Sequence, residues 1–560
     1  MEKSRIGVVV FLLYLSVFYP QSEVQSFATP SHHVLLTQSI ASISSYFADL
    51  SYMKFVYNST DLPLEEVYDY IVVGGGTAGC PLAATLSAKY SVLLLEKGSV
   101  PSAYPSVLRQ DEILTTLMLE DDGKTPAERF TSEDGVANVR GRVLGGSSMI
   151  NIGIYSRADK DFYGNSGIEW DMDLVSKAYH WVENTIISPP NVSRWQSVVK
   201  EGLLEAGISP DNGYTLNHIP GTKVSGTYFD NQGRRHGAVE LLNLGNPKNL
   251  RVAVHATVER IIFSSNAPSL SARGIVYSDS KGRSHKAFIR GKGEVILSAG
   301  AIGSTQLLLL SGVGPESYLS SIKIPVVHPE PYIGQFMRDN PRNYITILPP
   351  FQLDASSAQI VGITSDFYIE TFSGLPFSTP PFSVFPDPSF STKINSTFGQ
   401  IVYKIPGPLS YGSLRLQSSY DVKVGPNVRF NYFAKPLDLA RCVSATRKVG
   451  DLLSTNSLKP FKAQDLPGID GFNLFGPPLP MNLTDTASVE TFCRETVASF
   501  WHYHGGCLVG KVVDGDLRVK GINALRVVDG STVKFSPGTN PQATLMMLGR
   551  YIGVKMLKER

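Results

Sequence analysis

The sequence has little cysteine and almost no net charge. Its 560 residues contain four cysteines, too few for a disulfide-built scaffold and without the paired spacing of a zinc site. A net charge of +2 and the lack of any Lys/Arg cluster give no electrostatic basis for binding nucleic acid. The chain is too long for one ordinary core, so we expect two or more packed units.

Long hydrophobic runs are absent except at the N-terminus, where an apolar run covers residues 6–18. Lys3 and Arg5 precede the run, and small residues follow it up to Ser26. The run is short for a membrane span and has the layout of a secretory signal peptide, which we assign to residues 1–26. A buried core helix is the alternative. We therefore expect a chain that is secreted or luminal, with no membrane attachment after cleavage.

Four Asn-X-Ser/Thr triplets agree with that compartment, although such triplets often arise by chance. The acceptor asparagines are Asn58, Asn191, Asn395 and Asn482. An oxidising lumen also allows one disulfide, and we predict that it joins Cys442 to Cys493. Cys80 lies in a predicted buried helix and Cys507 lies beside two histidines.

A glycine-rich turn between two predicted strands is the first motif that indicates a ligand. A strand at 70–73 leads into Gly74-x-Gly76-x-x-Gly79, followed by a helix at 78–89 and a strand ending at Glu96. These glycines suit a tight turn, the approach of a phosphate and close helix–strand packing. The helix N-terminus can bind a pyrophosphate, and Glu96 can accept bonds from ribose hydroxyls. The motif predicts FAD or NAD rather than NADP, with a ligand-free glycine turn as the alternative.

Two later segments contain small residues that would let the backbone approach the same ligand. Gly145, Gly146 and Ser147 form one of them, and residues 291–315 predict a strand, a small-residue turn and a helix. The strand at 294–298 can join the same parallel sheet although it lies far along the chain. We therefore expect a nucleotide domain assembled from distant segments.

Two histidines one residue apart, His502 and His504, follow alternating β-formers and precede a Gly-Gly turn. The pattern predicts a strand with both side chains on one face. They can be metal ligands, core residues or a catalytic base; no nearby Cys, His or Asp cluster supplies a third ligand, so we predict no metal. Asn540 and Pro541 have the features of a helix N-cap and first turn, which would direct a positive dipole end at an anion.

Together these motifs resemble the glucose–methanol–choline (GMC) oxidoreductases, which bind FAD. The resemblance rests on the Gly74–Gly79 fingerprint with Glu96, and on "GRVLGGSSMIN" (141–151), "EVILSAGAIGSTQLLLLSGVGP" (294–315) and "LRVVDGSTVKFSPGTNPQATLMMLGRYIG" (525–553). Within that family the chain is most similar to the plant (R)-mandelonitrile lyases, through stretches such as "WDMDLV", "GPLSYGSL" and "WHYHGGCLVGKVVDGDLRV".

The resemblance implies an α/β fold, α+β overall. It has a Rossmann-like FAD-binding domain woven from separated segments and an inserted substrate-binding domain on a mainly antiparallel sheet. We place the FAD-binding domain at 67–161, 236–332 and 492–560, and the substrate-binding domain at 162–235 and 333–491. A Pro- and Phe-rich piece at 375–390 is expected to pack structurally or to line an apolar mouth.

The resemblance also implies roles for individual residues. His502 occupies the family's catalytic-base position and Asn540 would face it, with Glu370, Phe500 and Trp501 against the substrate. The residues expected around FAD are Gly74, Gly76, Thr77, Ala78, Gly79, Glu96, Lys97, Val143, Ser147, Asn151, Ile152, Gly153, Ile154, Val258, Trp501, Asp529, Gly530, Pro541 and Gln542.

The lyases that the chain resembles are aldehyde-lyases of plant cyanogenesis. They split (R)-mandelonitrile-type cyanohydrins into an aromatic aldehyde and hydrogen cyanide, with FAD that takes no electrons. This chain departs from them at three positions, with Asn540 for a histidine, Phe500 for a tyrosine and Glu370 for a cysteine. Because a His–Asn pair is common in the oxidising branches, an FAD-dependent alcohol oxidase or dehydrogenase is the alternative, followed by an FAD-binding relative without turnover. We expect a monomeric hydroxynitrile lyase of the apoplast, vacuole or protein body that acts on a small molecule.

Overall fold

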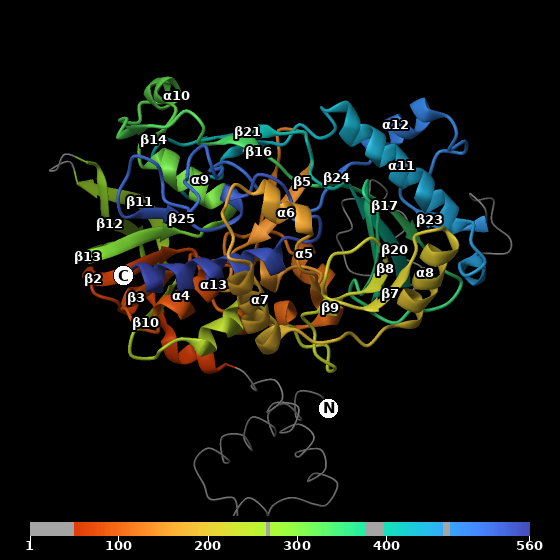
Figure 1. Ribbon diagram of the computed structural model, residues 1–560, viewed down its shortest axis with the longest axis horizontal. Coiled ribbons are helices and arrows are strands. Elements are labelled where there is room, and N and C mark those ends of the chain that lie inside the picture. Colours follow the sequence, from red (N-terminus) through yellow and green to blue (C-terminus); the bar gives the residue numbers. More distant parts are fainter. Residues whose placement is uncertain (1–49, 265–268, 377–396, 463–470) are drawn as a thin grey trace, which may run out of the picture. The chain divides into compact units, whose positions relative to one another are not determined.

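The computed structural model describes residues 50–264, 269–376, 397–462 and 471–560 (Figure 1). The predicted signal peptide, Asn395 and nearly all of the Pro- and Phe-rich piece lie outside these residues. The compact unit described below runs from Lys54 to Arg560. A search of the described residues finds no helix that is long and apolar enough to cross a membrane.

The first large sheet is mainly parallel and brings distant segments together. Its order is β1 (Val56–Asn58), β10 (Leu250–Val254), β3 (Val92–Leu95), β2 (Glu65–Val73), β13 (Ser284–Leu297), β12 (Ser271–Ser278) and β11 (Thr257–Ser264), and β25 (Leu525–Val527) also pairs with β13. The strands from β1 to β13 pair in parallel, whereas β13, β12 and β11 pair antiparallel. Tyr70 pairs with Glu294 and Val73 with Leu297. The predicted parallel pairing of these two segments is confirmed.

Three helices pack around this sheet: two contact its strands directly, and the third packs on the first of them. They are α4 (Gly79–Leu86), α9 (Gly300–Leu310) and α13 (Gln542–Glu559). A Cβ on Gly549 of α13 would lie 2.2 Å from the carbonyl oxygen of Ala78, so α13 passes directly over the start of α4. Helix α7 (Met172–Ile186) also packs on α13. Helix α7 belongs to the segment that we assigned to the substrate-binding domain, and it lies next to α13 (Figure 1).

The second large sheet is mainly antiparallel, as predicted. Its order is β23 (Leu474–Phe475), β17 (Pro341–Ile347), β20 (Thr397–Lys404), β19 (Tyr368–Pro376), β18 (Ile360–Ile363), β8 (Gly221–Val224) and β7 (Asp211–Tyr214), and β24 (Ala498–Ser499) pairs with β17. Among the described strands of this sheet, β7 and β8 pair in parallel. Helices α8 (Arg194–Glu205), α11 (Pro436–Leu453) and α12 (Thr486–Glu495) lie beside this sheet (Figure 1).

A hydrophobic core lies between the second sheet and the helices beside it. Trp195 of α8 is fully buried, and its indole N–H donates to Thr371 Oγ1 at 2.5 Å. Its ring occupies the space above Gly399, where a Cβ would come within 2.6 Å of the indole. The structure contains the predicted disulfide between Cys442 of α11 and Cys493 of α12. Cys80 and Cys507 are buried free thiols.

Smaller elements complete the described chain. They are α5 (Ile113–Met118), α6 (Lys160–Asn165), α10 (Glu316–Ser321) and four small sheets: β4 (Ala127–Thr131) with β5 (Ala137–Gly141), β6 (Ile154–Tyr155) with β9 (Gly226–Thr227), β14 (Val313–Gly314) with β15 (His328–Pro329), and β16 (Gln335–Met337) with β21 (Gly412–Arg415) and β22 (Asn427–Arg429). Asn58, Asn191 and Asn482 are exposed, so their side chains are accessible to glycosylation. Their glycosylation stays a prediction.

Candidate active site

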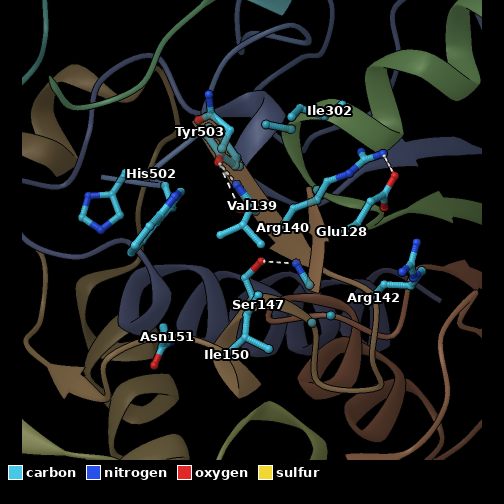
Figure 2. Close-up of a pocket in the computed structure, with 18 of the residues that line it drawn as sticks. Glu128, Val139, Arg140, Arg142, Ser147, Ile150, Asn151, Ile302, His502 and Tyr503 are labelled. Atoms are coloured by element: carbon cyan, nitrogen blue, oxygen red, sulfur yellow. Dashed lines mark hydrogen bonds and ion pairs between the residues drawn. The ribbon is translucent and has the colours of Figure 1, made fainter. Parts of the chain in front are cut away.

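A cavity of about 1220 Å³ extends from the glycine loops of the first sheet to the inner face of the second. It exceeds the roughly 300–1,000 Å³ typical of a pocket for one small ligand. Both predicted catalytic residues and all three predicted substrate residues line it. Figure 2 shows His502 on one side of the drawn lining and Arg140 and Glu128 on the other. The cavity therefore joins the predicted nucleotide and substrate regions.

The nucleotide end is formed largely by backbone. Gly146 has a φ of 61°, and a Cβ there would lie 2.7 Å from Cα of Gly76, so the two glycine loops meet directly. The Glu96 carboxylate, at the end of β3, accepts the N–H of Gly75 at 3.1 Å and of Gly98 at 2.8 Å. Burial raises the pKa of Glu96, whereas these backbone bonds act to lower it. The carboxylate is thus held in place with acceptor capacity left for a ligand hydroxyl.

This end fits a dinucleotide. No side chain caps the first N–H groups of α4, and none caps those of α13. A helix N-terminus with free donors is suited to a pyrophosphate. A Cβ at Gly76 would find no atom closer than 3.8 Å, so this backbone lies open to the cavity. The residues present therefore fit a dinucleotide such as FAD: the glycine loops could hold its phosphates, and Glu96 could accept a bond from a ribose hydroxyl.

Fifteen of the residues predicted around FAD line the cavity and four do not. Those on the wall are Gly74, Gly76, Thr77, Ala78, Glu96, Lys97, Ser147, Asn151, Ile152, Val258, Trp501, Asp529, Gly530, Pro541 and Gln542. Gly79, Val143, Gly153 and Ile154 lie outside that wall. Gly79 supports the loop from behind, because a Cβ there would lie 2.0 Å from the carbonyl oxygen of Gly74. The Ile154 carbonyl accepts the amide of Gln542.

Asp529 lines the cavity, but its carboxylate is engaged by protein groups. Oδ2 accepts the N–H of Gly300 at 2.9 Å and the hydroxyl of Ser304 at 2.5 Å. Oδ1 accepts the N–H and the hydroxyl of Ser531 at 2.8 and 2.6 Å. Asp529 therefore fastens the start of α9 to the loop after β25, and positions the cavity wall.

The two histidines do not lie in a strand, so that prediction is wrong. The strand β24 ends at Ser499, and Trp501 then adopts a φ of 60°, which turns the chain out of an extended path. The N–H of His502 donates to Asp339 Oδ1 at 2.8 Å. His502 lines the cavity, whereas His504 turns its Nδ1 to the carbonyl of His502 at 2.9 Å. Among the described residues, no group of three or more His, Cys, Asp or Glu side chains is placed to hold a metal ion.

Asn340 sets the tautomer of His502. The amide of Asn340 donates through Nδ2 to the carbonyl of Ile405 at 2.9 Å, so its Oδ1 faces Nδ1 of His502 at 3.2 Å. An amide oxygen accepts, which assigns the ring proton to Nδ1 and leaves Nε2 as a hydrogen-bond acceptor. Burial, and then the charges of Lys404, His504 and Arg342, hold the pKa of His502 well below its usual range. The ring is therefore neutral, and its Nε2 can accept a hydrogen bond or a proton from a ligand in the cavity.

Asn540 is not the helix cap that we predicted. Helix α13 begins at Gln542 with Pro541 at the N-cap, and no side chain caps it. Asn540 instead uses its amide in the cavity, where Oδ1 accepts the hydroxyl of Tyr368 at 3.1 Å. This bond turns Nδ2 towards His502 Nε2, at 3.5 Å, and towards Glu370 Oε2, also at 3.5 Å. Asn540 is a hydrogen-bond donor placed beside Nε2 of His502.

Sequence reasoning missed four polar residues at this end: Asn340, which contacts His502; Arg342, which lines the cavity; Tyr368, which contacts Asn540; and Lys404, which contacts the loop before Asn540. The last three come from β17, β19 and β20, and pairing of Tyr368 with Lys404 places them together. Lys404 Nζ donates to the carbonyls of Gly538 and Thr539 at 3.1 and 2.9 Å. These bonds fix the loop that directly precedes Asn540 in the sequence. No motif marks these residues, since each is a single polar residue in or beside a strand; only register brings them to one face.

Apolar side chains form the rest of the substrate end. Phe372, Phe398, Val402 and Phe500 belong to one buried cluster, against which Tyr344 packs, and all five line the cavity. The Phe500 ring lies 4.6 Å from that of His502, centroid to centroid. An aromatic group of a ligand can therefore pack beside the base.

Comparison with known proteins identifies relatives over the whole chain. The sequence matches the GMC oxidoreductase family at residues 68–342 and 408–549. It is 59% identical to (R)-mandelonitrile lyase 1 of Prunus serotina, covering 100% of this chain and 97% of the relative. It is 53% identical to sinalpyl alcohol oxidase Nec3 of Nesocodon mauritianus, covering 92% and 93%. The solved formate oxidase of Aspergillus oryzae superposes with a TM-score of 0.74 at 21% identity, covering 89% and 99%.

These relatives agree with the cavity. The family match includes the glycine loops and Glu96, and the residues there fit FAD, so FAD is the cofactor. The fold shared with formate oxidase agrees with the two sheets. The chain belongs to the GMC oxidoreductase family.

Proposed function

We propose that this protein is an FAD-containing hydroxynitrile lyase. It would cleave (R)-mandelonitrile-type cyanohydrins to an aromatic aldehyde and hydrogen cyanide. The observation that supports this most strongly is the 59% identity, over the full chain, to a (R)-mandelonitrile lyase. The apolar cluster around Phe500 suits the aromatic ring of such a substrate, and the neutral base His502 suits its hydroxyl.

In the proposed reaction, the chain moves protons and stabilises an anion. His502 Nε2 takes the hydroxyl proton while the Nδ2 of Asn540 donates to the substrate oxygen. The carbonyl forms as the C–CN bond breaks, and the electron pair of that bond leaves with cyanide. Arg342, which lines the cavity, would supply positive charge near the leaving anion. Bound FAD contributes to the structure and electrostatics of the site in this reaction and accepts no electrons.

An FAD-dependent alcohol oxidase is the second candidate. It is favoured by Asn540 beside His502 and by the 53% identity to sinalpyl alcohol oxidase Nec3. His502 would again take the hydroxyl proton, and the flavin would then serve as the hydride acceptor. The acidic Glu370 would suit a polar alcohol better than an apolar nitrile.

One purified, FAD-loaded sample distinguishes the candidates. One half receives (R)-mandelonitrile and is followed for benzaldehyde and cyanide, with His502→Ala as the control for spontaneous decay. The other half receives aryl and aliphatic alcohols and is followed for flavin bleaching without oxygen and for peroxide with oxygen. Cyanide release that depends on His502 supports the lyase. Bleaching by an alcohol without cyanide release identifies the oxidase. The absence of both cyanide release and bleaching identifies the inactive relative.

The remaining expectations stay proposals. They are a signal peptide at 1–26, glycosylation at the four acceptor asparagines, delivery to the apoplast, vacuole or protein body, a monomeric state and the domain boundaries given above. A small-molecule substrate agrees with the relatives and with the size of the cavity.

A further inference from the structure

We propose that Glu370 is a second proton-transfer group of this site. In cyanohydrin cleavage, its carboxylic acid would protonate the departing cyanide after His502 has taken the hydroxyl proton. The inference rests on the proposed lyase function and deepens it. It gives the site a proton donor beside Asn540, whose amide cannot transfer a proton.

The geometry places an acid and a base around one amide. Glu370 lies on β19, is 1% exposed and lines the cavity. Its Oε2 lies 3.5 Å from Asn540 Nδ2, and the same Nδ2 lies 3.5 Å from His502 Nε2. A substrate that accepts a hydrogen bond from this amide is therefore within reach of both the imidazole and the carboxyl group.

The surroundings of Glu370 allow it to hold a proton. Burial raises the pKa of Glu370 to about 7, against the opposing effects of Lys404, Asn540, Arg342 and Tyr368. Burial in turn lowers the pKa of Lys404 to about 7. Lys404 lies on the neighbouring strand β20 and Arg342 lies on β17. The side chains of both residues interact electrostatically with the Glu370 carboxyl group and act to lower its pKa. Glu370 is thus an acid near neutral pH, whereas an exposed glutamate would be ionised.

The proton balance closes over one turnover. The hydroxyl proton passes to His502 Nε2, the C–CN bond breaks, and the proton of Glu370 passes to cyanide to give hydrogen cyanide. The site is then left with an imidazolium and a carboxylate. Because the pKa of His502 is held well below that of Glu370, return of the proton from His502 to Glu370 through water is favourable. Both groups are restored and no proton is gained or lost.

The test compares Glu370→Gln with the wild type. Gln keeps the size and polarity of the side chain but supplies no acid. We expect kcat for cyanide release from (R)-mandelonitrile to fall roughly 10²- to 10⁴-fold, the usual contribution of a general acid, with FAD content and KM little changed. In the wild type kcat should fall as the pH rises through about 7, since Glu370 must be protonated. This fall should be absent from the residual activity of Glu370→Gln.

Two further variants make the outcome specific. Glu201→Gln makes the same chemical change on the exposed part of α8 and should leave kcat and the pH profile unchanged. Glu370→Asp keeps an acid and should retain a pH-dependent kcat, even where Glu370→Gln loses FAD. Wild-type kcat and pH dependence in Glu370→Gln, or a pH-independent kcat in Glu370→Asp, would overturn the inference and leave the lyase intact. A wild type that releases no cyanide would instead overturn the proposed function.

Discussion

The two ends of the cavity are built by different means. The nucleotide end is formed mainly by backbone. Gly76 and Gly146 lie against each other, no side chain caps the start of α4, and the Glu96 carboxylate is fixed by backbone donors. At the substrate end, side chains from different segments converge on His502 and Asn540. The hydrogen-bond partners of His502 determine that Nδ1 carries the ring proton and that Nε2 is the acceptor. A backbone site tolerates few changes, whereas a side-chain site can change its chemistry on the same scaffold.

The largest expected effect is at the nucleotide end. Gly146→Ala places a methyl group 2.7 Å from Cα of Gly76, where backbone would have to move. We expect the variant to lose FAD, and with it all activity, as measured by flavin absorbance after gel filtration. Gly282→Ala is the matched control, because Gly282 has a similar positive φ of 78° but a Cβ there meets nothing within 4 Å. Equal FAD content in the two variants would contradict a backbone-built site.

Removal of the base should leave the nucleotide end intact. In His502→Gln, we expect turnover to fall roughly 10²- to 10⁴-fold, since a general base is lost. FAD content should stay at the wild-type level, because His502 contacts the cavity from the substrate end. Turnover and bound flavin are measured on the same preparation. Loss of both flavin and turnover would show that FAD binding also depends on His502, so that the two ends of the cavity do not act independently.

Reduction of the disulfide should weaken the substrate side. The bond between Cys442 and Cys493 closes a loop of 51 residues. Loop-closure entropy assigns about 4 kcal/mol to such a bond as an upper value. We expect a reducing agent to lower the Tm of the wild type. The Cys442→Ser/Cys493→Ser variant should have this lower Tm without reductant, and a reducing agent should not change it further. The same Tm in both proteins without reductant would show that the cross-link contributes nothing.

The smallest effect is expected from the partner of the base. Asn340→Leu removes the acceptor from Nδ1 of His502, and one hydrogen bond corresponds to about tenfold in kcat. Because the tautomer is no longer fixed, the acid limb of the pH–rate profile should also move. A merely structural loss would lower the amount of active enzyme without moving that limb. Asn343→Leu, at a buried amide that lies outside the cavity wall and whose Nδ2 donates to Cys493 O at 3.0 Å, tests for that structural effect.

The sequence predicted the nucleotide end better than the substrate end. The strand, glycine turn, helix and Glu96 lie consecutively, so local spacing already specifies their geometry, and β13 joins them as expected. Lys404 and Tyr368 are opposite each other only because β19 and β20 pair in one register. Register depends on the whole sheet, which explains why no local pattern marked these residues.

Two predictions failed at the substrate end for a related reason. The β-formers around His502 predict a strand, but Trp501 adopts a left-handed φ next to the cavity. Asn540 has the side chain of a helix cap, yet Tyr368 engages its Oδ1 and turns its amide to the base. In both cases tertiary contacts at a functional site override local preference.

The most direct test of the account is the flavin spectrum recorded during turnover of (R)-mandelonitrile without oxygen. In the proposed lyase reaction the substrate end supplies only proton transfer and anion stabilisation, so the flavin should stay oxidised while many equivalents of cyanide and benzaldehyde accumulate. The His502→Gln variant should show the same oxidised spectrum with almost no cyanide above the spontaneous rate. Bleaching of the flavin in step with product, without cyanide, would contradict the account and assign the site to alcohol oxidation.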